Sequence, residues 1–223
     1  MTNICWICEK NNADSCEHRI LKSALNTIIG KPIRGESRYV TYIAGPQNVP
    51  VSSFKNNRFK FEKSICKHCN NALTQPYDDA FRFFINSLLK SKKITIARNK
   101  VSIPQNSQNL ALYFLKIFGC LIVERKASIE ESDYQLFRHS LLHGSVITNN
   151  VFLCMHRDLC KLSAKTSATV GQNSVVEKDF IAWTIDLDWI SLVLSYPFPP
   201  PKKYGTSWKL GSEIATLKLG KLQ

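Results

Sequence analysis

Apolar and polar residues follow two different periods along this chain, and together they predict a mixture of helices and strands. Apolar residues at helical spacing predict helices over 20–29, 109–123 and 132–142, the last ending at Gly144. A further helix is expected after residue 69, interrupted or restarted at Pro76. Alternating β-prone residues predict strands at 39–43, 54–61, 94–97, 101–103, 146–155, 175–183 and 189–196. The expected fold class is therefore α+β.

The informative motifs are confined to the first part of the chain, which suggests two domains. A basic run closes this part, and a boundary at 91–93 would separate residues 1–92 from residues 93–223. The first part is expected to be organised by a metal. The second carries α+β patterns and no motif that assigns it a role.

Two Cys-x-x-Cys pairs indicate a zinc site in the first part. Cys5 and Cys8 form one pair, and Cys66 and Cys69 form the other. Four thiolates are the usual ligand set of a structural Zn²⁺ ion, and pairs of this spacing in a cytosolic chain are typical of metal binding rather than of disulfides. These four cysteines are therefore expected to be scaffold, with any chemistry beside them.

The remaining cysteines are weaker candidates. Cys120 lies in an apolar run and is expected to be a small buried hydrophobe. Cys154, His156 and Cys160 match no common zinc spacing, so a second metal site there is disfavoured. Cys16 could take part in metal binding, although four ligands are already supplied.

Glu17 and His18 lie between the two pairs, at the end of a short predicted strand, and Asn70 follows Cys69 directly. A zinc ion that joins this strand to the following helix would bring the three side chains together. An imidazole can serve as a general base, while a carboxylate and an amide oxygen suit Mg²⁺. This set is what metal-assisted phosphodiester hydrolysis requires. The alternatives are an ordinary histidine at position 18 and a helix-capping role for Asn70.

The net charge of the chain also indicates a nucleic-acid partner. The chain carries 30 Lys and Arg against 17 Asp and Glu, a formal charge of +13. Such a charge attracts phosphate backbones, although it could also serve only solubility. The candidates for phosphate contacts near the proposed site are Arg19, Lys22, Arg58 and Lys67. No apolar run is long enough for a membrane span and no secretory signal is visible, so a cytoplasmic protein without membrane contact is expected.

At these residues the sequence resembles the HNH endonuclease family, over about residues 3–80. The family motif couples a Cys-x-x-Cys, an acidic residue before a histidine, and a second Cys-x-x-Cys followed by His or Asn, matched here by Glu17, His18 and Asn70. The resemblance implies a treble-clef ββα-metal finger. It also implies that His18 activates water and that Glu17 and Asn70 bind a catalytic Mg²⁺ or Mn²⁺ ion. The implied substrate is nucleic acid, with DNA expected before RNA, and dimerisation to cut both strands stays open.

The chain departs from the family pattern in three places. No proline follows His18, and Leu73 stands where the family often has a basic residue. The family's middle asparagine, which orients the base histidine, has no counterpart just before the second zinc pair; Asn57 is the nearest candidate. The first alternative is therefore a zinc-dependent nucleic-acid-binding module without catalysis. A second alternative is a C-terminal domain that binds a protein through Trp183, Trp189 and Tyr196, although aromatic residues in alternating strands are more often core.

Overall fold

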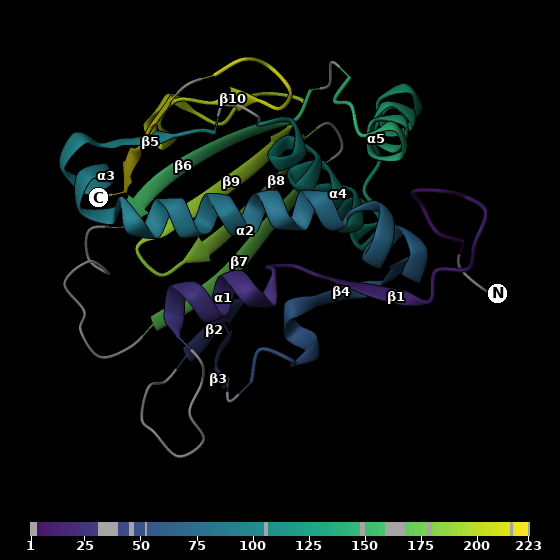
Figure 1. Cartoon of the computed structure of the whole chain (residues 1–223), viewed down its shortest axis with the longest axis horizontal. Coiled ribbons are helices and arrows are strands. Elements are labelled where there is room, and N and C mark those ends of the chain that lie inside the picture. The colour runs from purple at the N-terminus through teal and green to yellow at the C-terminus, as the bar shows by residue number, and fades with distance from the viewer. Residues whose placement is uncertain are drawn as a thin grey trace.

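The chain folds into a mixed α+β structure in which helices cover one side of a large curved sheet (Figure 1). The structure is a computed structural model and describes residues 4–30, 40–44, 47–51, 53–104, 107–147, 150–158, 168–177, 180–214 and 216–222. For residues 40–44 and 47–51 only the backbone is described.

The large sheet has eight strands in the order β10-β6-β9-β8-β7-β2-β3, with β12 added parallel to β6. Its strands are β2 (Val40–Ala44), β3 (Gln47–Val51), β6 (Phe152–Asp158), β7 (Ala168–Glu177), β8 (Phe180–Leu187), β9 (Ile190–Tyr196), β10 (Trp208–Lys209) and β12 (Gly220–Leu222). The pairs β6–β9, β8–β9 and β7–β8 are antiparallel, whereas β2 joins β7 in parallel. The C-terminal half of the chain therefore supplies most of this sheet.

Two smaller strand pairs complete the β-structure. β1 (Ser15–His18) pairs antiparallel with β4 (Lys60–Ile65), and β5 (Lys100–Ser102) pairs antiparallel with β11 (Thr216–Lys218). Short 3₁₀ turns, η1 (Asn57–Phe59) and η3 (Lys202–Tyr204), precede β4 and β10. The β1–β4 pair lies at the N-terminal end of the molecule, beside the first helix (Figure 1).

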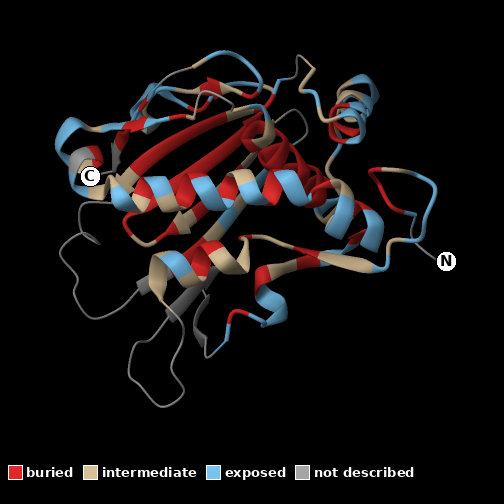
Figure 2. Ribbon diagram, viewed as in Figure 1, coloured by how far each residue is buried: buried red, intermediate tan, exposed pale blue. Residues whose placement is uncertain are grey.

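The helices are α1 (Lys22–Ile29), α2 (Gln75–Lys90), α3 (Lys92–Arg98), α4 (Gln108–Arg125) and α5 (Glu131–His143), and a π-helical turn, η2 (Cys69–Leu73), precedes α2. α4 is apolar on every side, and its residues 110–122 are all buried. It packs against α2, α5 and the β1–β4 pair. Buried residues accordingly line the centre of the molecule, while α2 keeps an exposed outer face (Figure 2).

Most helices predicted from the sequence are confirmed. α1, α4 and α5 match the three ranges expected from helical spacing, and Gly144 ends α5 in the left-handed conformation. The helix restart predicted at Pro76 is also confirmed, because α2 begins beside that residue. The strands at 39–43 and 189–196 are confirmed as β2 and β9.

The hairpin predicted around Asn99 is wrong in its first arm. Residues 94–97 belong to α3, where the Thr95 N–H donates to the Ser91 carbonyl at 2.8 Å and continues the helical path of the chain. Asn99 then adopts a left-handed conformation that ends the helix. The second arm forms β5, but it pairs with β11, a strand more than a hundred residues away. Local β-propensity is therefore overridden by the longer-range packing.

The remaining strand ranges are corrected in their boundaries. Within 54–61, residues 57–59 form η1 and the strand β4 starts only at Lys60. The strand expected at 146–155 begins at Phe152. The range 175–183 contains the end of β7 and the start of β8, with residues 178–179 outside the described residues.

One hydrophobic core runs through both parts that the sequence suggests as domains. It contains Trp6 and Phe81 from residues 1–92 and Phe118, Trp183 and Trp208 from residues 93–223. The three aromatic residues Trp183, Trp189 and Tyr196 are all buried, as their alternating pattern predicts. The two parts thus share a core through α4.

Candidate functional site

Four cysteine thiols converge at the N-terminal end of the molecule. The sulfur atoms of Cys5, Cys8, Cys66 and Cys69 all lie within 4.8 Å of one another, and those of Cys8 and Cys66 are 3.9 Å apart. A tetrahedral zinc ion with bonds of about 2.3 Å places its sulfur ligands about 3.8 Å apart. The donor set and its spacing therefore fit a structural metal such as zinc, as the sequence predicts.

Backbone hydrogen bonds shape the two turns that present these thiols. The Cys5 N–H donates to the Asn11 carbonyl at 2.8 Å, and the Glu9 N–H donates to the Cys5 carbonyl at 2.9 Å. In the second turn the Asn70 N–H donates to the Cys66 carbonyl at 2.9 Å. The Cys66 sulfur also accepts from the Cys69 N–H at 3.4 Å. These bonds fix the backbone of the two cysteine turns.

Contact with its neighbours also favours the anionic form of one thiol. A hydrogen bond from the Cys69 side chain lowers the pKa of Cys5 to about 4, while the same contact raises the pKa of Cys69. The proton therefore stays on the Cys69 sulfur, which donates it to the Cys5 thiolate. A bound metal would take the place of that proton.

The first turn is also anchored to the core through Trp6. Its backbone N–H donates to the Ser64 carbonyl at 3.0 Å, and its ring stacks on Tyr134 with centroids 5.7 Å apart. The ring covers Gly119 of α4 so closely that a Cβ atom there would lie 2.2 Å from it. The cysteine cluster is therefore joined to the central helix as well as to β4.

His18 ends β1 opposite Lys60 of β4, and it is half-buried. Burial lowers the pKa of its imidazole below the usual 6.5, and the positive charges of Lys60 and then Lys22 lower it further. The ring is therefore neutral at physiological pH. A neutral imidazole beside two lysines can accept a proton next to a bound anion.

Glu17 points the other way, into the interior, because neighbouring residues of a strand face opposite sides. Its carboxylate is 3 % exposed and accepts from the Lys116 ammonium of α4 at 3.0 Å. Lys116 is fully buried and also contacts the Asp78 carboxylate of α2 at 2.5 Å. Burial raises the pKa of Asp78 to about 6, although Lys116 opposes the rise. The sequence candidate Glu17 is thus one member of a buried carboxylate–ammonium–carboxylate triad.

Asn70 is held against β1, as the zinc-stapled arrangement predicts. Its side-chain amide donates to the Ser15 hydroxyl at 2.8 Å and to the Cys16 carbonyl at 3.3 Å. It therefore joins η2, the turn that precedes α2, to the strand that ends at His18. The Glu17 carboxylate is buried and paired with Lys116, so the structure does not bring the carboxylate and the amide to one exposed face.

The four basic residues proposed as phosphate contacts differ in how many contacts they make with other groups of the protein. Arg19 is paired with Glu124 at 2.5 Å, donates to the Lys60 carbonyl at 3.0 Å and stacks 4.5 Å above the ring of Phe61. Lys67 lies 3.5 Å from the Asp14 carboxylate, whose pKa is lowered first by a hydrogen bond from the Lys67 backbone.

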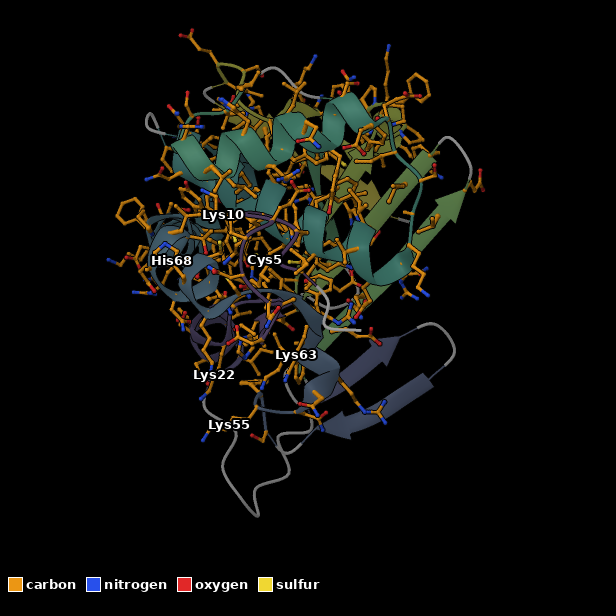
Figure 3. All side chains as sticks on the ribbon, turned by 90° about the vertical axis from the view of Figure 1, so that its right-hand side faces the viewer. Cys5, Lys10, Lys22, Lys55, Lys63 and His68 are labelled. Atoms are coloured by element: carbon orange, nitrogen blue, oxygen red, sulfur yellow. The ribbon has the colours of Figure 1, made fainter. Side chains whose placement is uncertain are left out.

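The other two basic candidates lie in η1 and at the start of α1. Arg58 is exposed in η1, and Lys22 is half-buried at the start of α1, near His18. In the view from this end of the molecule, Lys10 and Lys63 are nearest to Cys5, and Lys22 and Lys55 lie below it (Figure 3).

Lys60, Asp78 and Lys116 are the residues that sequence reasoning missed. The sequence could have identified Lys116, because it is the single charged residue inside the apolar run 109–123. A charge in a buried helix needs a partner, so acidic residues elsewhere had to face it. Lys60 and Asp78 gave no comparable signal, because their positions depend on strand register and helix packing.

The other cysteines play no part in the cluster. Cys120 is buried and burial raises its pKa to about 12, as expected of a small hydrophobe in the core. Cys154 is buried as well, while Cys160 falls outside the described residues. Within the described part of the chain, Cys5, Cys8, Cys66 and Cys69 form the single grouping of three or more metal-binding side chains.

Among the helices that the structure describes, none is both long enough and apolar enough to cross a bilayer. Comparison of this chain with protein-family models, with curated proteins and with solved structures finds no match.

Proposed function

We propose that this protein is a zinc-organised nuclease that hydrolyses phosphodiester bonds with His18 as the general base. The observation that carries the proposal is the position of a neutral imidazole at the end of β1, opposite Lys60 of β4 and near the charge of Lys22. A cysteine turn, the β1–β4 pair, a second cysteine turn and a helix follow in the order of the expected treble-clef arrangement, with α1, β2 and β3 inserted between β1 and β4.

The chemistry follows from these groups. His18 takes a proton from a water molecule as the water oxygen attacks phosphorus, and the bond from phosphorus to the leaving oxygen breaks. The leaving oxygen then takes a proton from solvent. Lys22 and Lys60 attract the phosphate and stabilise the charge that grows on its oxygens in the transition state. The four-cysteine metal acts only as scaffold in this scheme, because a closed tetrahedral site leaves no open position for substrate.

A catalytic Mg²⁺ or Mn²⁺ ion does not fit the donors in this arrangement. Glu17 is buried and already neutralised by Lys116, whose ammonium group occupies the approach to the carboxylate. The Asn70 side chain donates to β1 and shares no exposed face with Glu17. We therefore assign no step of the reaction to such an ion at Glu17 and Asn70.

The test is cleavage of supercoiled plasmid and of a labelled duplex by zinc-loaded protein, with and without added Mg²⁺. His18→Ala should lower the cleavage rate by about 10²–10⁴-fold, the range for loss of a general base. His139→Ala is the matched control, because His139 is an exposed histidine of α5. Equal cleavage by the His18→Ala and His139→Ala proteins would overturn the assignment of His18.

A second candidate function is nucleic-acid binding without cleavage, and the buried triad is the observation that favours it. A protein that only binds has no need of a free carboxylate at position 17, and Glu17 is engaged by Lys116. In that case the protein shifts a labelled duplex in a gel while leaving it intact, and His18→Ala changes neither result.

A further inference from the structure

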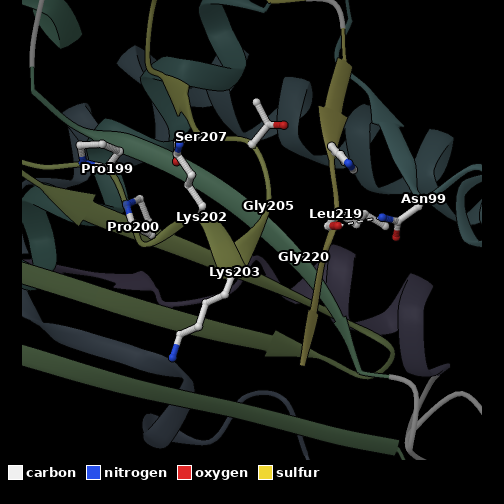
Figure 4. Close-up of a pocket in the computed structure, with 11 residues that line it drawn as sticks. Asn99, Pro199, Pro200, Lys202, Lys203, Gly205, Ser207, Leu219 and Gly220 are labelled. Carbon is white, nitrogen blue, oxygen red and sulfur yellow. Dashed lines mark hydrogen bonds between the residues drawn. The ribbon is translucent and has the colours of Figure 1, made fainter. Parts of the chain in front are cut away.

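A basic cavity lies between the η3 segment and the strands β11 and β12 (Figure 4). This is the side of the molecule on which the chain ends, away from the N-terminus and its cysteine turn (Figure 1). Its volume is about 710 Å³, within the range of about 300–1,000 Å³ typical of small-molecule sites. Pro199, Pro200 and Lys202 line one side, and Asn99 and Leu219 line the opposite side (Figure 4).

The charge of this cavity has one sign. Lys202, Lys203 and Lys218 are among its lining residues, which include no aspartate or glutamate. Within the described residues, Lys202 and Lys218 form no ion pair, and both are exposed. Two unneutralised ammonium groups beside a cavity favour an anionic ligand.

The walls of the cavity are fixed by hydrogen bonds that cross between its segments. The Leu219 N–H donates to the Asn99 carbonyl at 3.0 Å, and the Asn99 side chain donates back to the Leu219 carbonyl at 2.9 Å. The Thr206 N–H donates to the Lys218 carbonyl at 2.9 Å. The cavity is therefore held open by backbone geometry before any ligand arrives, which lowers the ordering cost of binding.

Gly205 makes this close approach of the segments feasible. Its φ of +99° lies in a region that other residues rarely adopt, and a Cβ atom there would lie 2.2 Å from the Lys218 carbonyl oxygen. The loop that carries Lys202 is thus packed directly on the strand that carries Lys218. The side chains of Lys202 and Lys218 therefore start from backbone segments that touch each other. This proximity allows both ammonium groups to bind the same ligand.

We propose that this cavity binds a phosphate group carried by a nucleotide, with Lys202 and Lys218 as its charged ligands. The hydroxyl groups of Thr206 and Ser207 supply further donors, and Pro199 and Pro200 offer an apolar surface for a base or sugar. The phosphate can come from a free nucleotide or from a nucleic-acid backbone. The proposal does not depend on the function proposed for His18, because the two sites share no residue.

The test measures binding by the full-length, zinc-loaded chain and its variants. Lys202→Ala/Lys218→Ala removes both charges, and Lys202→Arg/Lys218→Arg retains them. The matched control is Lys10→Ala/Lys63→Ala, which removes two exposed lysines from the other end of the molecule. Zinc content and thermal unfolding are checked for each protein. One arm uses adenosine monophosphate in calorimetry, with adenosine as the phosphate-free comparison.

The second arm uses a labelled single-stranded oligonucleotide at several salt concentrations. Each phosphate contact on a single strand contributes about 0.7 to the slope of log K against log salt, so loss of two contacts should lower it by about 1.4.

A free-nucleotide site predicts that adenosine monophosphate binds and that Lys202→Ala/Lys218→Ala weakens it about tenfold or more, while the arginine pair and the control pair do not. A backbone site predicts no mononucleotide binding and a fall of the salt slope in that variant alone. The proposal is overturned if the alanine pair leaves adenosine monophosphate binding as it is in wild type and also changes the salt slope no more than the control pair does.

Discussion

Replacing Lys116 by methionine tests whether the buried triad stabilises the fold. Lys116 is fully buried and holds two carboxylates, Glu17 at 3.0 Å and Asp78 at 2.5 Å. Methionine has nearly the same length and no charge, so the variant keeps the packing of α4 while both carboxylates lose their counter-ion. These carboxylates come from β1 and α2, so the ammonium group joins three elements of the core.

Removing one partner of a buried ion pair costs about 3–5 kcal/mol of unfolding free energy. For a chain of this size that loss corresponds to a fall in Tm of about 6–20 °C. The cost should depend on pH through Asp78. Its pKa in the folded state is already raised from 3.8 to about 6, and loss of the attraction from Lys116 raises it further.

A raised carboxyl pKa in the folded state contributes stability at low pH that is lost as pH rises through that pKa. In wild type this loss falls between about pH 4 and 6, and in Lys116→Met it continues above pH 6. The difference in stability between the two proteins should therefore be larger at pH 8 than at pH 5.5.

Urea unfolding of the zinc-loaded proteins at the two pH values measures this difference. Lys90→Met is the matched control, because Lys90 is an exposed lysine at the end of α2. A loss below about 1 kcal/mol, or an equal loss at both pH values, would refute the view that Lys116 neutralises the two carboxylates.

Two further predictions concern the cysteine cluster. Purified protein should contain one zinc ion per chain by elemental analysis, and Cys66→Ser should lose it while Cys16→Ser keeps it; retention by Cys66→Ser would contradict the four-sulfur site. Gly119→Ala should lower stability by about 1–3 kcal/mol in thermal unfolding, because the new Cβ would meet the Trp6 ring at 2.2 Å. Since alanine otherwise favours a helix by about 1 kcal/mol, a gain in Tm would show that Trp6 does not pack on α4.

The cysteine cluster could be predicted from the sequence because its information is local. A Cys-x-x-Cys turn has the right spacing to present two thiols to one ion, and two such turns complete the set. The strand that ends at His18 and the helix restart at Pro76 were likewise readable from short patterns. These features need no knowledge of the rest of the fold.

The surroundings of the site could not be predicted, because they depend on segments far apart in the sequence. Lys116 meets Glu17 across 99 positions and Asp78 across 38. The sequence made Arg19 a candidate phosphate ligand, yet its guanidinium group pairs with Glu124 and stacks on the ring of Phe61. The helix at 94–97 formed against its local β-propensity for the same reason, since packing decides between states of similar local energy.

The pH dependence of cleavage tests the proposed role of His18 most directly. A general base must be neutral, so the rate rises as pH passes its pKa and then levels off. Burial and the charges of Lys60 and Lys22 lower the pKa of His18 below 6.5. The rate of cleavage of a labelled duplex should therefore be half-maximal below pH 6.5 in wild type, with the rise missing in His18→Ala. A half-maximal rate above pH 6.5, or the same profile in both proteins, would contradict the account.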